Sequence, residues 1–301
     1  MKFGNGFKAV ALLFAGSAFL AGCGNDNADN KAATAKASAP AVDSHGMTAE
    51  GRKAAQEFED MNKPLRTEFS APEVVDGAAY LNVLSKTAAL QIYTAKRGWA
   101  ESDEEIAKSA SGAILIQSEL PELYKLEEEL GRSDDAFEKH DLTEKIAGLI
   151  KNEAEKINGN IRVKMTVNAD LKSFDFGSKT FVSENCLMSE KLEYTKEDNR
   201  SPDAFARAQK PRCYLQPSIT NFLVGVINGS KLNLVIADES IARKIESARA
   251  GAKFEVYGYV ASVERERLGG TPRDARYVMI DPQRVNLISK ENGETLYSQT
   301  F

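Results

Sequence analysis

The sequence predicts an α+β fold in which an N-terminal helical region is followed by a β-rich C-terminal domain. Through residues 48–158, apolar residues recur every three or four positions, as on one face of a helix. From residue 160 onward they alternate with polar residues, as in half-buried strands. Helices followed by strands are typical of α+β proteins or of two subdomains. We expect a small helical bundle and either an open twisted sheet or a small, partly open barrel with one short helix.

Capping residues and prolines divide the first region into helices. Ser102 and Glu105 have the spacing of a capping box, and Pro121 suits the first turn of a helix. Pro64 and Pro72 interrupt the helical pattern after the first helix. The expected helices begin at Thr48, cover residues 77–97, cover residues 103–118, restart at Pro121, and run from Asp134 or Asp135 to Asn158-Gly159.

Turn residues divide the second region into strands. Asn228-Gly229 predicts a tight hairpin between strands at 221–226 and 232–237. Gly269-Gly270-Thr271-Pro272 predicts a polar hairpin tip, and Asp238 begins a short helix that ends near Arg249. The other expected strands cover residues 161–167, 174–182 with a bend at Gly177, 254–262, 277–288 and, at an edge, 295–301.

The charge is modest and unevenly distributed. The net charge of -5 gives no strong positive field, so we expect no nucleic-acid partner. Residues 101–157 hold seven Lys and Arg against sixteen Asp and Glu, a local charge of -9, whereas residues 158–301 hold twenty-one against eighteen, or +3. The acidic block is interpreted either as solvated helix faces or as a surface for a basic partner.

The N-terminus has the pattern of an export signal. Lys2 and Lys8 precede an apolar stretch over residues 9–20, which is too short to span a bilayer and is typical of a secretory signal peptide. The next residues complete Leu20-Ala21-Gly22-Cys23, which resembles the lipobox of bacterial lipoproteins. The resemblance implies that the chain is cut before Cys23, and that Cys23 carries a diacylglycerol and a further acyl chain such as palmitate.

The same resemblance implies a location. Gly24, where Asp would favour inner-membrane retention, indicates sorting to the outer membrane, with the folded part facing the periplasm. Residues 24–46 lack large apolar side chains, so we expect a disordered tether. The expected segments are a signal peptide (1–22), the lipidated Cys23 with its tether (23–46), a helical domain (47–158) and a β-rich domain (159–301).

A second resemblance covers residues 160–301. The runs VNADLKSFDFGSKTFV and LVIADESIARKIESARAGAKFEVYGYVASV are similar to an uncharacterised domain of proteobacterial envelope lipoproteins. That domain has no known activity, so this resemblance implies a location and nothing chemical.

The remaining cysteines predict a disulfide. Cys186 and Cys213 form an even pair in an exported chain and enclose a polar, turn-rich segment that lacks a core of its own. Two free thiols or a metal pair are the alternatives, although neither CxxC nor a nearby His supports metal binding. We therefore expect a disulfide between Cys186 and Cys213, no metal and no cofactor.

The sequence contains no recognisable catalytic motif. His45 lies in the expected tether and His140 on a polar helix, and there is neither G-x-S-x-G nor a phosphate-binding loop. Acids near strand ends could form a hydrolytic pair, but they also suit turns and helix caps. These acids are Asp170, Asp175, Asp238, Glu239 and Asp281.

One candidate binding face remains. Tyr257 and Tyr259 share one side of their strand, and arginines gather near the following hairpin tip. The tyrosines are interpreted either as a stacking platform or as part of the core. The arginines are suited to phosphate, a lipid headgroup, a glycan or an acidic protein surface. The candidate face comprises Tyr257, Tyr259, Arg265, Arg267, Arg273 and Arg276.

These observations predict a non-enzymatic lipoprotein anchored in the outer membrane, acting as a binding or envelope-assembly factor. Its expected partners are the membrane, through the lipid anchor, and an envelope protein or glycan. The alternatives are a cell-wall or polysaccharide hydrolase that uses two carboxylates, and a module that binds a small ligand or a glycan.

Overall fold

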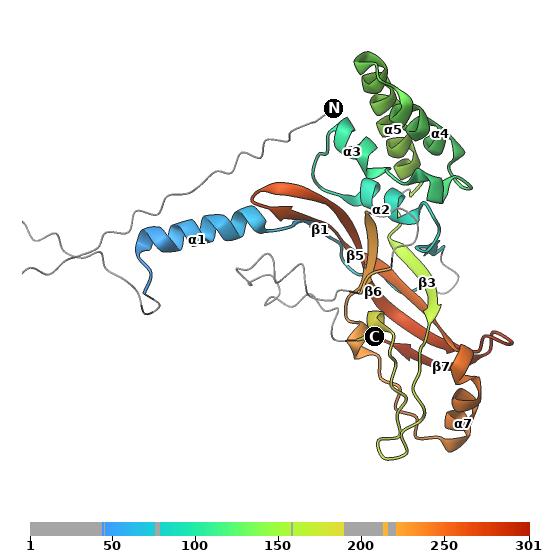
Figure 1. Ribbon diagram of the computed structural model, residues 1–301. Helices are drawn as coiled ribbons and strands as arrows, with labels where there is room; N and C mark the ends of the chain where they lie inside the picture. The colour runs from blue at the N-terminus through green and yellow to red at the C-terminus, as the bar shows by residue number, and fades with distance from the viewer. Residues whose placement is uncertain (1–43, 45, 76–78, 158, 190–212, 216–220) are drawn as a thin grey trace, which may run out of the picture. The chain divides into compact units, whose positions relative to one another are not determined.

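Two long antiparallel strands, β5 (Lys253–Leu268) and β6 (Thr271–Ile288), form the centre of the sheet in the computed structural model (Figure 1). The structure describes residues 44, 46–75, 79–157, 159–189, 213–215 and 221–301. The signal peptide, the lipobox and the tether up to residue 43 lie outside the described residues. Among the described residues, no helix has the length and apolar character needed to cross a bilayer.

The other strands join this central pair to give a mixed, curled sheet. The strand order is β2-β3-β5-β6-β4, with β1 paired to β5 and β7 paired to β6. The β2–β3 and β4–β6 pairs are parallel, and the other pairs are antiparallel. The added strands are β1 (Leu65–Glu68), β2 (Leu81–Asn82), β3 (Arg162–Asn168), β4 (Phe222–Val226) and β7 (Thr295–Thr300).

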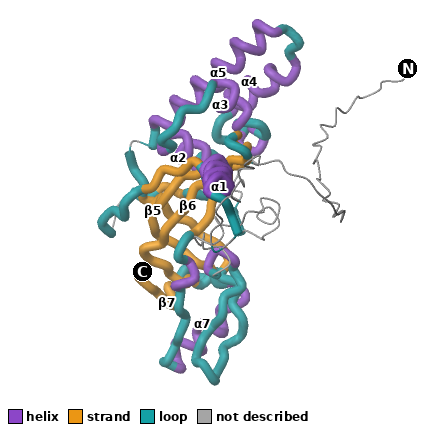
Figure 2. The backbone as a smooth tube through the Cα atoms, turned by 90° about the vertical axis from the view of Figure 1, so that its left-hand side faces the viewer, coloured by secondary structure: helices purple, strands orange, loops and turns teal. Residues whose placement is uncertain are grey.

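Apart from α1, which lies beside the tip of the β5–β6 hairpin, the α-helices lie at two ends of this sheet (Figures 1 and 2). The group α2 to α5 lies at one end, with α2, α3 and α4 each packed against α5, and α7 lies at the other. The α-helices are α1 (Ala49–Asn62), α2 (Ala88–Lys96), α3 (Asp103–Ser109), α4 (Pro121–Arg132), α5 (Ala136–Glu155) and α7 (Glu239–Ala248). The 3₁₀ turns are η1 (Ala113–Ile116), η2 (Cys186–Met188), η4 (Gly229–Lys231) and η5 (Arg249–Gly251).

The curl of the sheet coincides with irregular pairing in the long hairpin. The register of β5 against β6 shifts at three places, the first between Tyr257 and Gly258. Bulges of this kind bend a strand and increase its twist. At the first shift the backbones come very close, because a Cβ added to Gly258 would lie 2.3 Å from the carbonyl oxygen of Asp281. Only glycine fits there without moving the neighbouring strand.

A single hydrophobic cluster joins the helical and strand regions. Ile92 of α2 and Ile146 of α5 belong to the same buried set as Phe222 of β4, Val263 of β5 and Val278 of β6. The predicted α+β fold, with helices first and a β-rich region after them, is therefore confirmed. The capping box at Ser102, the edge strand β7 and the helix begun by Asp238 also lie where they were predicted.

The helix predicted over residues 77–97 is wrong in its first half. Leu81 pairs with Val163 in the parallel β2–β3 ladder, and the helix begins only at Ala88. The first turn of α2 has no cap from its own Thr87; instead the Glu119 carboxylate accepts hydrogen bonds from Lys86 N (3.2 Å) and Thr87 Oγ1 (3.0 Å). A distant carboxylate thus fixes the start of this helix.

The helix predicted over residues 103–118 is also shorter. It ends at Ser109, because Gly112 adopts a left-handed φ of 89° and the chain then forms a 3₁₀ turn. The strand predicted over 174–182 is a tight turn with isolated bridges, held by the Asp175 carboxylate, which accepts hydrogen bonds from Gly177 N and Ser178 N.

The hairpin predicted at Asn228-Gly229 is absent, because β4 already has neighbours on both sides. One side pairs in parallel with β6, and on the other Val224 exchanges backbone hydrogen bonds of 2.8 Å with Leu215. Gly229 serves a packing role instead. A Cβ at that position would lie 2.1 Å from the carbonyl oxygen of Leu187, so the glycine lets η4 approach η2.

Candidate functional site

The structure divides the predicted Tyr/Arg face into three separate environments along the β5–β6 hairpin. Arg265 and Arg276 face each other in the register of the two strands and are 3% and 1% exposed. Both therefore lie in the interior rather than on a surface.

Arg265 and Arg276 form a buried charge cluster with Glu101 and Tyr93. Arg265 Nη1 lies 2.8 Å from Glu101 Oε1, and Arg276 Nη2 lies 3.5 Å from Glu101 Oε2. The Tyr93 hydroxyl donates a hydrogen bond of 2.7 Å to Glu101 Oε1. Glu105, half-buried at 39%, adds a second carboxylate 3.0 Å from Arg265 Nη1. The cluster joins the helical region to the sheet.

Ionisation in this cluster follows from its charges. Burial alone would raise the pKa of the Glu101 carboxyl, but Arg276, the Tyr93 hydroxyl, Arg97 and Arg265 outweigh it and hold that pKa below its usual value. Burial, together with the neighbouring Glu101 charge, raises the pKa of the Tyr93 hydroxyl far above its usual value. The cluster therefore contains an ionised Glu101 and a neutral Tyr93 at pH 7.

The other two arginines of the face lie near the hairpin tip. Arg267 caps the C-terminal end of α1, because its Nη2 and Nε donate hydrogen bonds of 2.7 Å each to the carbonyl oxygens of Asp60 and Lys63. Arg273 is exposed, and its carbonyl oxygen accepts a hydrogen bond of 2.8 Å from Arg265 Nε. Arg273 is thus the exposed arginine of the predicted face.

The two tyrosines differ in exposure. Tyr257 is half-buried, with the Tyr80 ring edge-on at 5.1 Å and the Arg284 guanidinium 4.7 Å from its ring centre. Tyr259 is 8% exposed, and its hydroxyl donates a hydrogen bond of 3.2 Å to Asp281 Oδ2. Tyr259 is therefore a packed residue, and Tyr257 is partly accessible on the sheet face.

Helix α1 offers a different surface. Hydrogen bonds from the hairpin fix its last turn: Gly269 N donates to Asn62 Oδ1 (2.9 Å) and Gly270 N donates to Met61 O (3.0 Å). Of the fourteen residues of α1, only Asn62 is buried. Three large apolar side chains at this junction are 45–46% exposed: Phe58, Met61 and Leu268. We call these three residues the α1 tip.

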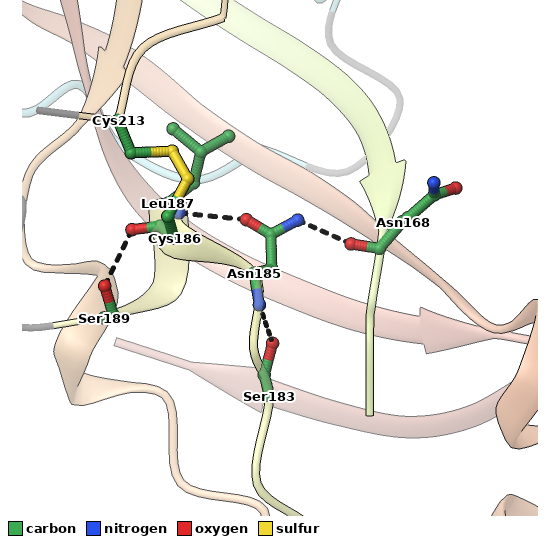
Figure 3. The surroundings of a disulfide bond; sticks show 7 residues. All are labelled: Asn168, Ser183, Asn185, Cys186, Leu187, Ser189 and Cys213. Atoms are coloured by element: carbon green, nitrogen blue, oxygen red, sulfur yellow. Dashed lines mark hydrogen bonds between the residues drawn. A yellow bond between two sulfur atoms is a disulfide. The ribbon is translucent and has the colours of Figure 1, made fainter. Parts of the chain in front are cut away.

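Figure 3 shows the surroundings of the cysteine pair, which was predicted as a disulfide. Cys186 and Cys213 lie at disulfide distance, with 5.7 Å between their Cα atoms. Asn185 fixes the segment before Cys186, since its Oδ1 accepts a hydrogen bond from Leu187 N (2.9 Å) and its Nδ2 donates one to Asn168 O (2.6 Å). The pair therefore lies next to the end of β3.

A polar hollow of about 460 Å³ opens beside this segment, where β3 ends and β5 begins. Ala250 and Gly251 of η5 and the following Ala252 also line it. We call it the η5 hollow. Its charged and amide side chains are Asn168, Asp170, Glu184, Arg249, Lys253 and Lys290.

The acids considered as a hydrolytic pair are dispersed. Asp175 holds its own turn, Asp238 caps α7, and Glu239 pairs with Arg243 at 2.7 Å. Asp281 accepts from Tyr259, and Asp170 lines the η5 hollow. Glu184 lines the same hollow but forms an ion pair of 2.9 Å with Lys172. His140 is exposed, 3.4 Å from Glu144 on α5, and within the described residues no group of His, Cys, Asp and Glu has the geometry of a metal site.

Sequence reasoning missed several of these residues. Glu101 precedes a capping serine, a place where an acid is ordinarily solvated, so nothing local indicates its burial. Lys253 and Lys290 flank the ends of two paired strands, and a correct β5–β6 register would have been the signal that brings them together. The chain matches no known protein family, no curated protein and no solved structure in the comparisons made.

Proposed function

We propose that this protein is an outer-membrane lipoprotein of the periplasmic side that binds another envelope protein and does not catalyse a reaction. The lipobox-like Leu20-Ala21-Gly22-Cys23 supports the anchor, and the Cys186–Cys213 pair at disulfide distance supports an oxidising compartment. The observation that carries the binding role is the α1 tip, whose exposed apolar side chains come from the C-terminal part of α1 and from the end of β5.

The α1 tip has the geometry of a helix that docks into a groove. Phe58 and Met61 are three residues apart and so lie on one helix face, as in recognition by a partner's apolar groove. An isolated helix of this length is only marginally stable in water, so covering this face stabilises it. Glu57 lies beside this face and pairs with Lys53 at 3.8 Å, whereas Glu59 and Asp60 lie on the other side of the helix. The partner proposed here is therefore a protein that presents an apolar groove to Phe58 and Met61.

Site-specific photocrosslinking in the native host tests this proposal. A benzophenone side chain at Phe58 or Leu268 is expected to give one dominant adduct with an envelope protein. Phe137, which is 83% exposed at the start of α5, is the matched control position and is expected to give no such adduct. Met61→Glu, with Phe58 carrying the crosslinker, is expected to abolish the adduct, because it places a carboxylate in the apolar contact.

Two outcomes would contradict the binding role: equal adducts at Phe58 and Phe137, or an adduct that Met61→Glu leaves unchanged.

The lipid anchor has its own test. Cys23→Ser is expected to release the protein from membranes and to abolish labelling by a palmitate analogue, because the thiol that would carry the lipid is gone. A protein that stays in the membrane fraction after this change would refute the lipid anchor.

The hydrolase alternative requires two carboxylates that face one space. Asp170 and Glu184 line the η5 hollow together, but the ion pair of Glu184 with Lys172 favours a structural role for that carboxylate. A turnover activity on cell-wall material that is lost in Asp170→Asn would favour the hydrolase over our proposal.

A further inference from the structure

We propose that the η5 hollow binds an anionic group, a carboxylate or a phosphate, of a small hydroxylated molecule such as an acidic sugar. The hollow lies where β3 and β6 end and β5 begins, at the other end of the β5–β6 hairpin from the α1 tip. The inference is therefore independent of the partner surface proposed above. Its volume of about 460 Å³ falls within the range of small-molecule sites.

The charges of the hollow favour an anion. Arg249, Lys253 and Lys290 are positive, whereas Asp170 and Glu184 are negative. Glu184 is already paired with Lys172 outside this set. Within the described residues, neither Lys253 nor Lys290 has an ion-pair partner. In the described part of the chain, the hollow therefore holds two ammonium groups without an ion-pair partner against one unpaired carboxylate, that of Asp170, which leaves a net positive charge.

Arg249 gives this hollow a fixed wall. Its Nε donates a hydrogen bond of 3.0 Å to Glu246 Oε1, and its Nη1 donates one of 3.1 Å to the carbonyl oxygen of Leu171. Glu246 also accepts a hydrogen bond of 3.0 Å from Phe174 N. Arg249 lies at the C-terminal end of α7 and so offsets the partial negative charge there. Arg249 is therefore engaged within the protein, and Lys253 and Lys290 are the groups that bind the anion in this proposal.

The sheet beside the hollow can bind hydroxyl groups. Asn168 pairs with Lys253 across β3 and β5, and the next row on the same face runs from Thr166 to Glu255 and on to Asn286. These side chains are exposed or half-buried. Asn286 donates to Glu255 (3.3 Å) and accepts from Ser298 (2.8 Å), so the hydroxyl of Thr166 and the amide of Asn168 are the groups that this row offers to a ligand. Within the described residues the Asp170 carboxylate has no hydrogen-bond partner and can accept a sugar hydroxyl. A polar row next to two cations fits a molecule with hydroxyls and one anionic end.

Calorimetric titration of the full-length protein at low ionic strength tests the inference. The probes are glucuronate, glucose 6-phosphate and inorganic phosphate, with glucose as the neutral control. The anionic probes are expected to bind saturably, and glucose to bind far more weakly. Lys253→Met with Lys290→Met is expected to weaken binding about tenfold for each ammonium removed, since each provides a charge-assisted hydrogen bond.

The matched control is Lys139→Met with Lys231→Met, which removes two exposed lysines that lie outside the hollow and has the same effect on net charge. It is expected to leave the affinity unchanged. Equal affinity for inorganic phosphate and glucose 6-phosphate would identify free phosphate as the occupant. Tighter binding of glucose 6-phosphate or glucuronate than of inorganic phosphate would identify an acidic sugar. Both results support an anion site. The absence of saturable binding, or equal losses in the two double variants, would overturn it. Thermal unfolding of each variant checks that the fold is intact.

Discussion

Replacing Glu101 by Gln tests whether the buried charge cluster holds the helical region on the sheet. The change keeps the shape of the side chain and removes its charge. Arg265 then keeps only the Glu105 carboxylate within the cluster, and Arg276 keeps hydrogen bonds to the backbone oxygens of Asp274 and Glu105. Removing one partner of a buried ion pair costs about 3–5 kcal/mol. Because the amide oxygen can still accept from Tyr93, we expect about 3 kcal/mol, a large share of a typical stability of about 5–15 kcal/mol.

Urea unfolding measures this loss. The single tryptophan, Trp99, lies with its ring centre 5.9 Å from that of Tyr93, so its fluorescence reports on the cluster. The midpoint is expected to fall while the slope with urea stays constant. Glu105→Gln is the control, since that side chain is 39% exposed and its pair with Arg265 is worth under about 1 kcal/mol. If Glu101→Gln costs no more than this control, the cluster does not hold the two regions together.

The same residue predicts a dependence on pH. The Glu101 pKa is lowered in the folded protein from its usual value of 4.5, because the attraction of Arg276, the Tyr93 hydrogen bond and the other arginines outweighs burial. Its stabilisation is therefore fully present above pH 4.5 and is lost as the pH falls through the folded pKa. The stability difference between the native protein and Glu101→Gln should narrow below pH 4.5, and a difference that stays constant down to acid unfolding would contradict this assignment.

Three further changes have expected outcomes. Arg267→Ala removes the cap of α1 and should speed hydrogen exchange in its last turn, whereas unchanged exchange would mean that the cap is dispensable. Gly258→Ala should cost about 1–3 kcal/mol in urea unfolding because its Cβ meets a backbone oxygen, while the control Gly148→Ala in α5, which has open space, should gain about 0.5–1 kcal/mol. Reduction of Cys186 and Cys213 should add two hydrogens to the intact mass and cost about 3.5 kcal/mol for a loop of 27 residues; an unchanged mass would show two free thiols.

The parts of the fold that the sequence predicts are those set by local chemistry. The capping box at Ser102, the cap at Asp135 and the alternation in β3 each involve residues within one turn or one strand. Each therefore has a local signature that the surrounding structure does not override.

The parts that escaped prediction depend on distant residues. Leu81 has a helical pattern in the sequence but pairs with Val163 in a strand, and the residues before α2 are held by Glu119, which accepts hydrogen bonds from Lys86 N and Thr87 Oγ1. Asn228-Gly229 has the composition of a hairpin, but the edge of β4 is occupied by Leu215. In each case a contact made far along the chain outweighs a weak local preference.

The candidate site shows the same limit. The arginines of β5 and β6 were recognised as a group, but their burial depends on Glu101, which is 164 residues away from Arg265. The η5 hollow combines side chains from β3, the end of α7 and β5 with that of Lys290, so no single stretch of sequence contains its pattern. Only the register of the sheet brings them together.

The long hairpin also bears on how this chain can vary over evolution. β1 and β2 come from the first third of the described chain, yet they complete a sheet whose central strands end near its C-terminus. A gene fragment beginning at residue 159 would encode a sheet in which β5 lacks its partner β1 and β3 lacks its partner β2. It would also lack Glu101 and Glu105, whose carboxylates pair with the buried arginines of β5 and β6. The two regions are therefore expected to be inherited, lost and recombined together, never as interchangeable modules.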